Sequence, residues 1–239
     1  MQLRSEVLLV PTFTIRRSSW RTAAAALVVV LAVGACSGGA NEAEDRLCQF
    51  PADTAAGNTL RQVLGTDDVE TAINATDEQL REHVSRLLDE FDGRRPTSNT
   101  SACSFQPKAH IGAERLRVEF SWVPPTGDPK ASAKYLSGAS HYNLGGVLGE
   151  SNDIGTGLRV ACRLRGKPES DKALLYAQAA NGMYRGRTVD QEMKNRQIEF
   201  LYFQTRNAVQ ILGCENGPLT KDPDARPYSS AEEAAEGGQ

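Results

Sequence analysis

The sequence contains no apolar run long enough to cross a membrane as a helix. Its most apolar segment, residues 23–35, has 13 residues, whereas a membrane-spanning helix needs about 20. The GxSxG pattern of many hydrolases and the lysine-containing glycine loop of nucleotide-binding proteins are also absent. The three histidines are scattered along the chain. We therefore expect no catalytic residues and no cofactor.

The chain also lacks an excess of basic residues. It has 27 Lys and Arg against 30 Asp and Glu, a net charge of −3. Residues 1–35 hold four of the basic residues and one of the acidic residues, so the chain after residue 35 keeps 23 and 29 and carries −6. An acidic chain is poorly suited to the phosphate backbone of nucleic acids. We therefore expect no nucleic-acid partner.

The apolar run follows a basic segment and ends at a cysteine. Residues 1–22 hold four arginines and one glutamate, and a run of this length behind a basic flank is typical of a secretory signal peptide. It ends in Val33-Gly34-Ala35-Cys36. This ending resembles the lipobox of bacterial lipoprotein precursors, in which an aliphatic residue and two small residues precede the cysteine. The resemblance implies cleavage after Ala35 and attachment of a lipid to Cys36.

The alternative is a simple secretory signal that ends at a cysteine by chance, and export by either the general or the twin-arginine route stays open. With a lipid on Cys36, the mature protein is expected on the outer side of the cell membrane. The expected parts of the chain are a signal peptide at 1–35, a lipidated flexible tether at 36–47, an exported domain at 48–215 and a disordered tail at 216–239.

Four cysteines follow Cys36. An even number of cysteines in an exported chain predicts disulfides. A zinc site is the alternative, but zinc sites take cysteines in close pairs and these lie about 50 residues apart, so we expect no metal. Of the three possible connectivities, we favour Cys48–Cys103 and Cys162–Cys214, because each would join the ends of one helix-bearing segment.

Apolar spacing predicts three helices. The clearest begins after Thr76, which lies three residues before Gln79 as in a capping box, and ends at Gly93. The other expected helical segments are residues 58–64, a turn or two at 67–72, and a long helix over 188–212.

Alternating apolar and polar residues predict four strands. The clearest alternation spans residues 115–123, and the others are at 102–106, 158–165 and 172–180. Residues 124–156 are rich in Gly, Ser and Asn and are expected to form loops. This order of elements favours an α+β fold, an antiparallel sheet of about four strands with helices packed on one face.

The polar side of two predicted strands carries five arginines. Arginine side chains bind carboxylates and phosphates through paired hydrogen bonds, so this face is a candidate site for an anionic envelope polymer or an acidic protein partner. The alternative is a solvated sheet face with local ion pairs. The candidate binding residues are Arg115, Arg117, Arg159, Arg163 and Arg165.

The signal, lipobox, tether and two-disulfide domain together resemble the small membrane lipoproteins of actinobacteria. The resemblance does not identify functional residues in the domain. We expect a membrane-anchored, non-enzymatic binding or interaction module for an envelope polymer or a protein. The alternatives are an envelope hydrolase with a site near residues 137–157 and an accessory or sensor subunit of an exported system.

Palmitate labelling in a host that processes the chain tests the lipid anchor. The Cys36→Ser variant should lose all incorporated label, because the lipid is attached through the thiol of Cys36. A Cys214→Ser variant is the matched control and should keep the label. Label that persists in Cys36→Ser contradicts the predicted anchor.

Overall fold

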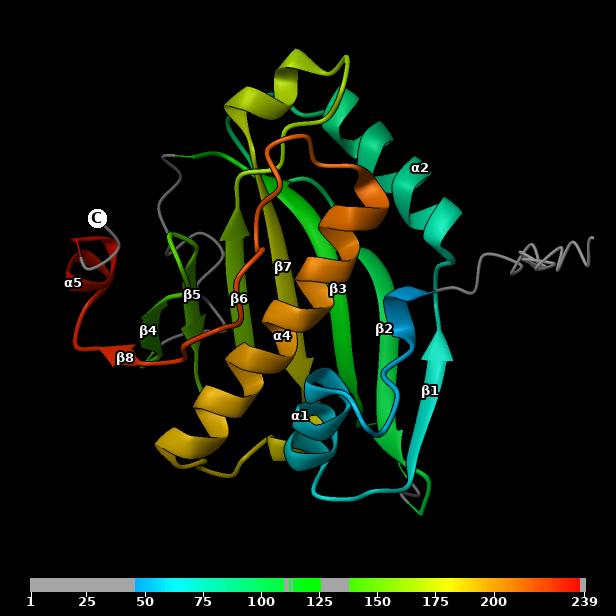
Figure 1. The fold of residues 1–239 in the computed structure, drawn as a ribbon, viewed down its shortest axis with the longest axis vertical. Helices are drawn as coiled ribbons and strands as arrows, with labels where there is room; N and C mark the ends of the chain where they lie inside the picture. Colours follow the sequence, from blue (N-terminus) through cyan, green and yellow to red (C-terminus); the bar gives the residue numbers. More distant parts are fainter. Residues whose placement is uncertain (1–45, 110–111, 113, 126–137, 237–239) are drawn as a thin grey trace, which may run out of the picture. The chain divides into compact units, whose positions relative to one another are not determined.

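The structure is a computed structural model, and it describes residues 46–109, 112, 114–125 and 138–236 (Figure 1). The predicted signal peptide, Cys36 and residues 37–45 of the predicted tether lie outside the described residues. The helices are η1 (Arg46–Cys48), α1 (Ala55–Leu64), α2 (Asp77–Asp89), η2 (Pro168–Lys172), η3 (Gly182–Tyr184), α4 (Gln191–Leu212) and α5 (Ala231–Glu236). The strands are β1 (Val69–Ile73), β2 (Thr100–Pro107), β3 (Leu116–Val123), β4 (Ser140–Asn143), β5 (Leu148–Ser151), β6 (Gly155–Val160), β7 (Leu174–Asn181) and β8 (Pro227–Tyr228).

The described strands form one antiparallel sheet. Its order is β1-β2-β3-β7-β6-β5-β4-β8, and every neighbouring pair is antiparallel. The expected α+β class and antiparallel sheet are confirmed. The expected strand number is wrong, because the sheet has eight strands and not about four.

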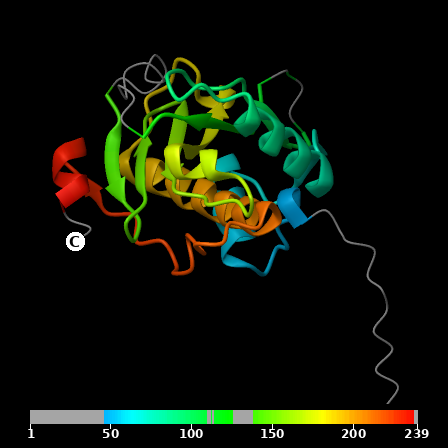
Figure 2. The same ribbon diagram turned by 90° about the horizontal axis from the view of Figure 1, so that it is seen from above.

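Helices α1, α2 and α4 pack on one face of the sheet, called the helix face here. Helix α4 contacts β5, β6 and β7, and α1 packs against α4 (Figures 1 and 2). Trp122 of β3 donates its indole N–H to the carbonyl of Val84 in α2 at 2.8 Å. Alternate residues of β3 from Leu116 to Trp122 are buried on this face, whereas Arg117 is exposed on the opposite one. The predicted alternation in residues 115–123 is confirmed.

Local sequence signals explain where the helices begin and end. Thr76 accepts a hydrogen bond from the backbone of Gln79, whose side chain accepts one from the backbone of Thr76, so the predicted capping box is present. Helix α2 ends at Asp89, earlier than the expected Gly93. Helix α4 is one continuous helix, as expected, and ends at Gly213, whose φ of 73° suits the left-handed conformation of a glycine cap.

Three other segments differ from the sequence expectations. Residues 67–72 were expected to be helical but belong largely to β1, which pairs with β2. Residues 124–156 were expected to be loop, yet they contain β4, β5 and the start of β6. The segment 216–236, expected to be a disordered tail, forms β8 and α5 and buries Leu219 and Ala234.

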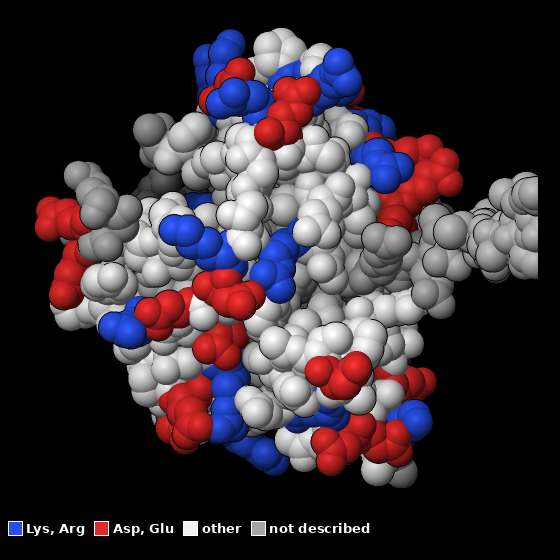
Figure 3. All heavy atoms as spheres, viewed as in Figure 1, with Lys and Arg blue, Asp and Glu red and all other residues white. Residues whose placement is uncertain are grey.

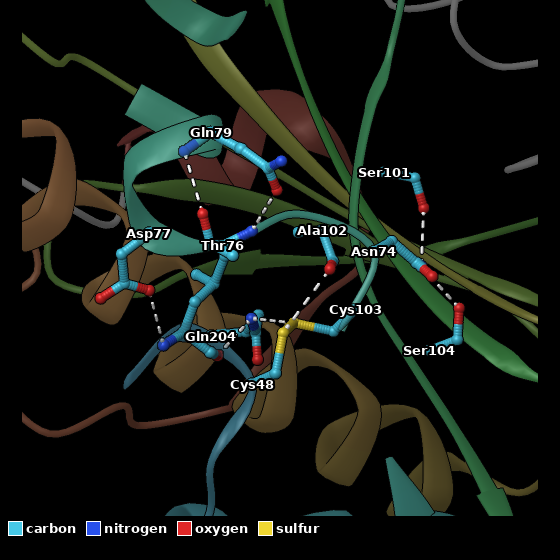
Figure 4. The surroundings of a disulfide bond; sticks show 11 residues. Cys48, Asn74, Thr76, Asp77, Gln79, Ser101, Ala102, Cys103, Ser104 and Gln204 are labelled. Atoms are coloured by element: carbon cyan, nitrogen blue, oxygen red, sulfur yellow. Dashed lines mark hydrogen bonds between the residues drawn. A yellow bond between two sulfur atoms is a disulfide. The ribbon is translucent and has the colours of Figure 1, made fainter. Parts of the chain in front are cut away.

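Both favoured disulfides are present. Cys48 of η1 is bonded to Cys103 of β2 with a Cα–Cα distance of 5.7 Å, and Cys162 is bonded to Cys214 just beyond α4 with 5.0 Å. Both cysteines of the first bond are buried, and Figure 4 shows the residues around it. Beside it, Gln204 of α4 donates to the carbonyl of Leu47 at 2.8 Å. The disulfide and Gln204 therefore hold the start of the domain against both the sheet and α4.

Removing either disulfide should destabilise the domain by about 2–5 kcal/mol, because the unfolded chain is no longer closed into a long loop and gains conformational entropy. The Cys48→Ala/Cys103→Ala variant should lose more of the free energy of unfolding than Cys162→Ala/Cys214→Ala. Cys48 and Cys103 are buried, whereas Cys214 is partly exposed. Urea unfolding of the full chain measures both. An unchanged midpoint in either double variant would contradict this prediction.

Candidate functional site

The five candidate arginines do not form one face. Arg117 of β3 and Arg159 of β6 lie on the open face, the sheet face opposite α1, α2 and α4. Arg115 precedes β3. The strand expected over 158–165 ends at Val160, so Arg163 and Arg165 lie in the following loop. The prediction of a five-arginine face is therefore wrong in extent.

Three of these arginines are paired with carboxylates. Arg163 contacts Asp171 at 3.1 Å, and Arg165 contacts Glu215 at 3.8 Å. The third, Arg159, is described below. On the helix face, basic and acidic side chains are interspersed and do not gather into a large area of one sign (Figure 3). The helix face and these three arginines therefore favour polyanion binding less than the sequence alone does.

The most buried charges of the open face lie on β5 and β6. Glu150 has a side-chain exposure of 6% and Arg159 of 20%, and Arg159 Nη2 donates to Glu150 Oε1 at 3.0 Å. The Arg159 guanidinium also lies 5.5 Å from the centre of the Tyr176 ring, within the range of a cation–π interaction. Two partners thus fix the position of the guanidinium.

Gly157 makes this arrangement possible. It lies opposite Glu150 in β5 and Gln178 in β7, and a Cβ at this position would lie 2.4 Å from the Tyr176 hydroxyl. Only glycine leaves room for the phenol ring across β6. Burial raises the pKa of Tyr176, and the charge of Glu150 raises it further, while Arg159 lowers it. The phenol is therefore neutral at physiological pH.

A hollow of about 530 Å³ surrounds the β4–β5 hairpin. Glu150, Arg159 and His141 line it together with apolar side chains such as Leu148 and Leu174. This volume and this mixture of many apolar groups with a few polar ones are typical of small-ligand sites. The hollow, with the Glu150–Arg159 pair in its wall, is the candidate functional site.

The segment after α4 forms another wall of the hollow. Asn216 donates to the carbonyl of Ala161 at 2.7 Å, and the Tyr202 hydroxyl donates to that of Lys221 at 2.6 Å. Between them, Leu219 has a φ of 64° and is the one non-glycine residue of the described chain with positive φ. This conformation costs about 1–3 kcal/mol and is found preferentially at functional sites.

Tyr142 lines the hollow and is firmly held. Its hydroxyl donates to Asn195 Oδ1 at 3.0 Å and accepts from Gln191 Nε2 at 2.8 Å. Burial raises the pKa of Tyr142 to about 12, although the hydrogen bond from Gln191 lowers it. The ring is therefore a neutral, rigid part of the wall.

Sequence reasoning missed most of this site. It assigned Leu148 and Glu150 to a loop, and it did not single out Gly157 or Tyr176. Little signal was present here, because Leu148 to Ser151 shows no alternation of apolar and polar residues.

Membrane-spanning helices and metal sites are both absent from the described part of the chain. None of its helices is both long and apolar enough to cross a membrane. In the same residues, no group of three or more His, Cys, Asp or Glu side chains is placed to hold a metal ion.

Comparison with known proteins adds no identity. No family model, curated protein or solved structure matches this chain.

Replacing Arg159 by Met should lower the free energy of unfolding by about 2–4 kcal/mol, because the buried Glu150 carboxylate loses its partner. The Glu150→Leu/Arg159→Met double variant should recover most of this loss, because neither charge then remains buried. Urea unfolding of the wild type and the two variants measures the loss and its recovery.

The matched control is Arg163→Met. The Arg163–Asp171 pair has side-chain exposures of 62% and 59%, so its loss should cost less than about 1 kcal/mol. Equal losses of unfolding free energy in Arg159→Met and Arg163→Met would show that the Glu150–Arg159 pair contributes no more to stability than an exposed ion pair.

Proposed function

We propose that this protein is a membrane-anchored, non-enzymatic binding module that holds a neutral segment of an envelope glycan in the hollow beside the β4–β5 hairpin. The single observation that carries the proposal is the hollow itself, because one wall holds a buried and oriented charge pair. The lipid anchor on Cys36 and the location outside the cytoplasm are part of this proposal.

The charge pair indicates the kind of ligand. Arg159 and Glu150 neutralise each other, so the pair has no net charge with which to attract a polyanion. The guanidinium nevertheless has further N–H donors, and the carboxylate has further acceptor positions. A ligand with neighbouring hydroxyl groups can use both at once, because each hydroxyl donates and accepts.

The apolar wall of the hollow favours the same class of ligand, one with neighbouring hydroxyl groups. Leu148, Leu174 and Pro124 line the hollow beside the charge pair. A sugar ring presents C–H groups on its faces and hydroxyls at its edge. The faces suit apolar side chains, and the edge suits the guanidinium and the carboxylate. A glycan therefore fits the hollow better than a purely apolar or a highly charged ligand.

Nothing in the described site favours the hydrolase alternative. His141 and Glu150 lie opposite each other in β4 and β5, but no hydrogen bond joins the His141 ring to a hydroxyl or thiol among the described residues. A nucleophile paired with a base is the minimum arrangement for covalent hydrolysis. The proposal is accordingly one of binding.

Binding of neutral and anionic envelope oligosaccharides to the full chain in detergent tests the proposal. We expect neutral fragments to bind, and the Glu150→Leu/Arg159→Met variant to weaken binding at least tenfold, because it loses both the donors and the acceptors. Calorimetric titration measures the affinity, and mass spectrometry of the sugar after incubation shows whether it is intact.

The Arg163→Met variant is the control and should bind like the wild type. Three outcomes contradict the proposal. They are undiminished binding by the double variant, binding of anionic fragments alone, and cleavage of the sugar.

A further inference from the structure

The two edges of the sheet differ in how they are protected. Strand β8 forms one edge and has only two residues, the first of which is Pro227. Short edge strands and prolines prevent further strand pairing. Strand β1 forms the other edge, and its sequence Val-Glu-Thr-Ala-Ile contains no proline, lysine or glycine. In the described residues, no strand pairs with the outer side of β1.

The backbone of β1 presents three residues to this open edge. Lys108 N donates to Asp68 O, and Asn74 N donates to Ala102 O, so Asp68 and Asn74 are in hydrogen-bonded pairs with β2. Residues of an antiparallel ladder alternate between bonded and non-bonded pairs. The N–H and C=O groups directed outward are therefore those of Val69, Thr71 and Ile73.

One of these three residues has an exposed apolar side chain. Ile73 is 47% exposed and is the one large hydrophobic side chain exposed in the described part of the chain. It is opposite Cys103 in the sheet register, and Thr71 is opposite Phe105, so both lie on the helix face. An exposed isoleucine on an unprotected edge strand is a typical position for an added strand.

We propose that β1 pairs antiparallel with β1 of a second copy of this chain, with Thr71 on the twofold axis. With the axis there, Thr71 lies opposite Thr71 of the second copy, and Val69 lies opposite Ile73 of the second copy. All three residues have the outward-directed N–H and C=O that a bonded pair requires. The pairing is self-complementary, as a twofold interface must be.

The same register is favourable for the side chains. Ile73 gains an aliphatic neighbour, Val69 of the other copy, on the same face. On the opposite face, Glu70 lies across from Ala72. Beyond the strand, Asp68, which is already paired with Lys108 at 2.6 Å, lies across from the uncharged Asn74. No carboxylate is placed directly opposite another. The two copies of Glu70 are diagonal neighbours, about 7–8 Å apart, and each accepts a hydrogen bond from Gln106.

The segment of this chain that precedes η1 is a weaker candidate for the same edge. Residues 37–45 read SGGANEAED and contain no β-branched or aromatic residue, which are the types favoured in strands. Their three carboxylates would also approach Asp67, Asp68 and Glu70. A second copy offers a β-branched strand whose carboxylates are not placed directly opposite those of β1.

Cysteine crosslinking of the full chain in its host membrane tests the register. The reagent should span about 8 Å, which exceeds the ~5 Å between opposed Cβ atoms and falls short of the ~13 Å offset between residues four positions apart. Thr71→Cys should give a product of twice the chain mass. Ile73→Cys alone should not, whereas Ile73→Cys expressed together with Val69→Cys should.

Glu82 of α2 is exposed, and Glu82→Cys is the matched control. It should give at most one fifth of the dimer yield of Thr71→Cys. Adding Ile73→Lys to Thr71→Cys should lower the dimer yield at least fivefold, because a charge is then placed on the apolar contact. The proposal is overturned if Thr71→Cys links no better than Glu82→Cys, or if Ile73→Lys leaves the yield unchanged. It is also overturned if Ile73→Cys links to itself. These results are independent of glycan binding.

Discussion

Burial of α4 against the sheet is the constraint on which the other parts depend. The helix contacts β5, β6 and β7 on one face of the sheet, and α1 and α2 pack beside it. Both disulfides secure it, because Cys214 follows its C-terminus and Gln204 lies beside the Cys48–Cys103 bond. The helix also passes so close to β5 that a Cβ at Gly149 would lie 2.8 Å from Ile198. Because α4 occupies the helix face, a charged pair such as Glu150–Arg159 is found on the open face.

This close packing explains what the sequence could and could not predict. The capping box at Thr76, the alternation in β3, the long helix and both disulfide pairings depend on local pattern or on chain context, and all were predicted correctly. Strand β5 and the start of β6 were not, because Gly149 and Gly157 resemble loop residues in a single sequence. In the fold they are strand positions that Ile198 or Tyr176 approaches so closely that a Cβ would require the neighbouring side chain to shift.

The arginine prediction failed for a related reason. Alternation alone cannot show where a strand ends, and β6 ends at Val160, before Cys162 joins the end of α4. Nor can it show that a basic side chain has a partner. Arg159 is opposite Leu148 in the register, and its ion pair is with Glu150, two residues further along β5. The pairing converts an expected anion site into a neutral one, and this change shifts the proposed ligand from a polyanion to a glycan.

The two proposed surfaces lie toward opposite edges of the sheet, and this placement has a consequence for binding. Five strand spacings separate β1 from β5, which is about 24 Å at 4.8 Å per spacing. Two copies joined at β1 would therefore carry their hollows about 50 Å apart, both free of the interface. A short oligosaccharide would occupy one hollow only. A polymer longer than this span would occupy both, and its apparent affinity would rise through the effective concentration of the second site. A dimer joined at β1 would accordingly bind polymeric glycan more tightly than short fragments without a change in either hollow.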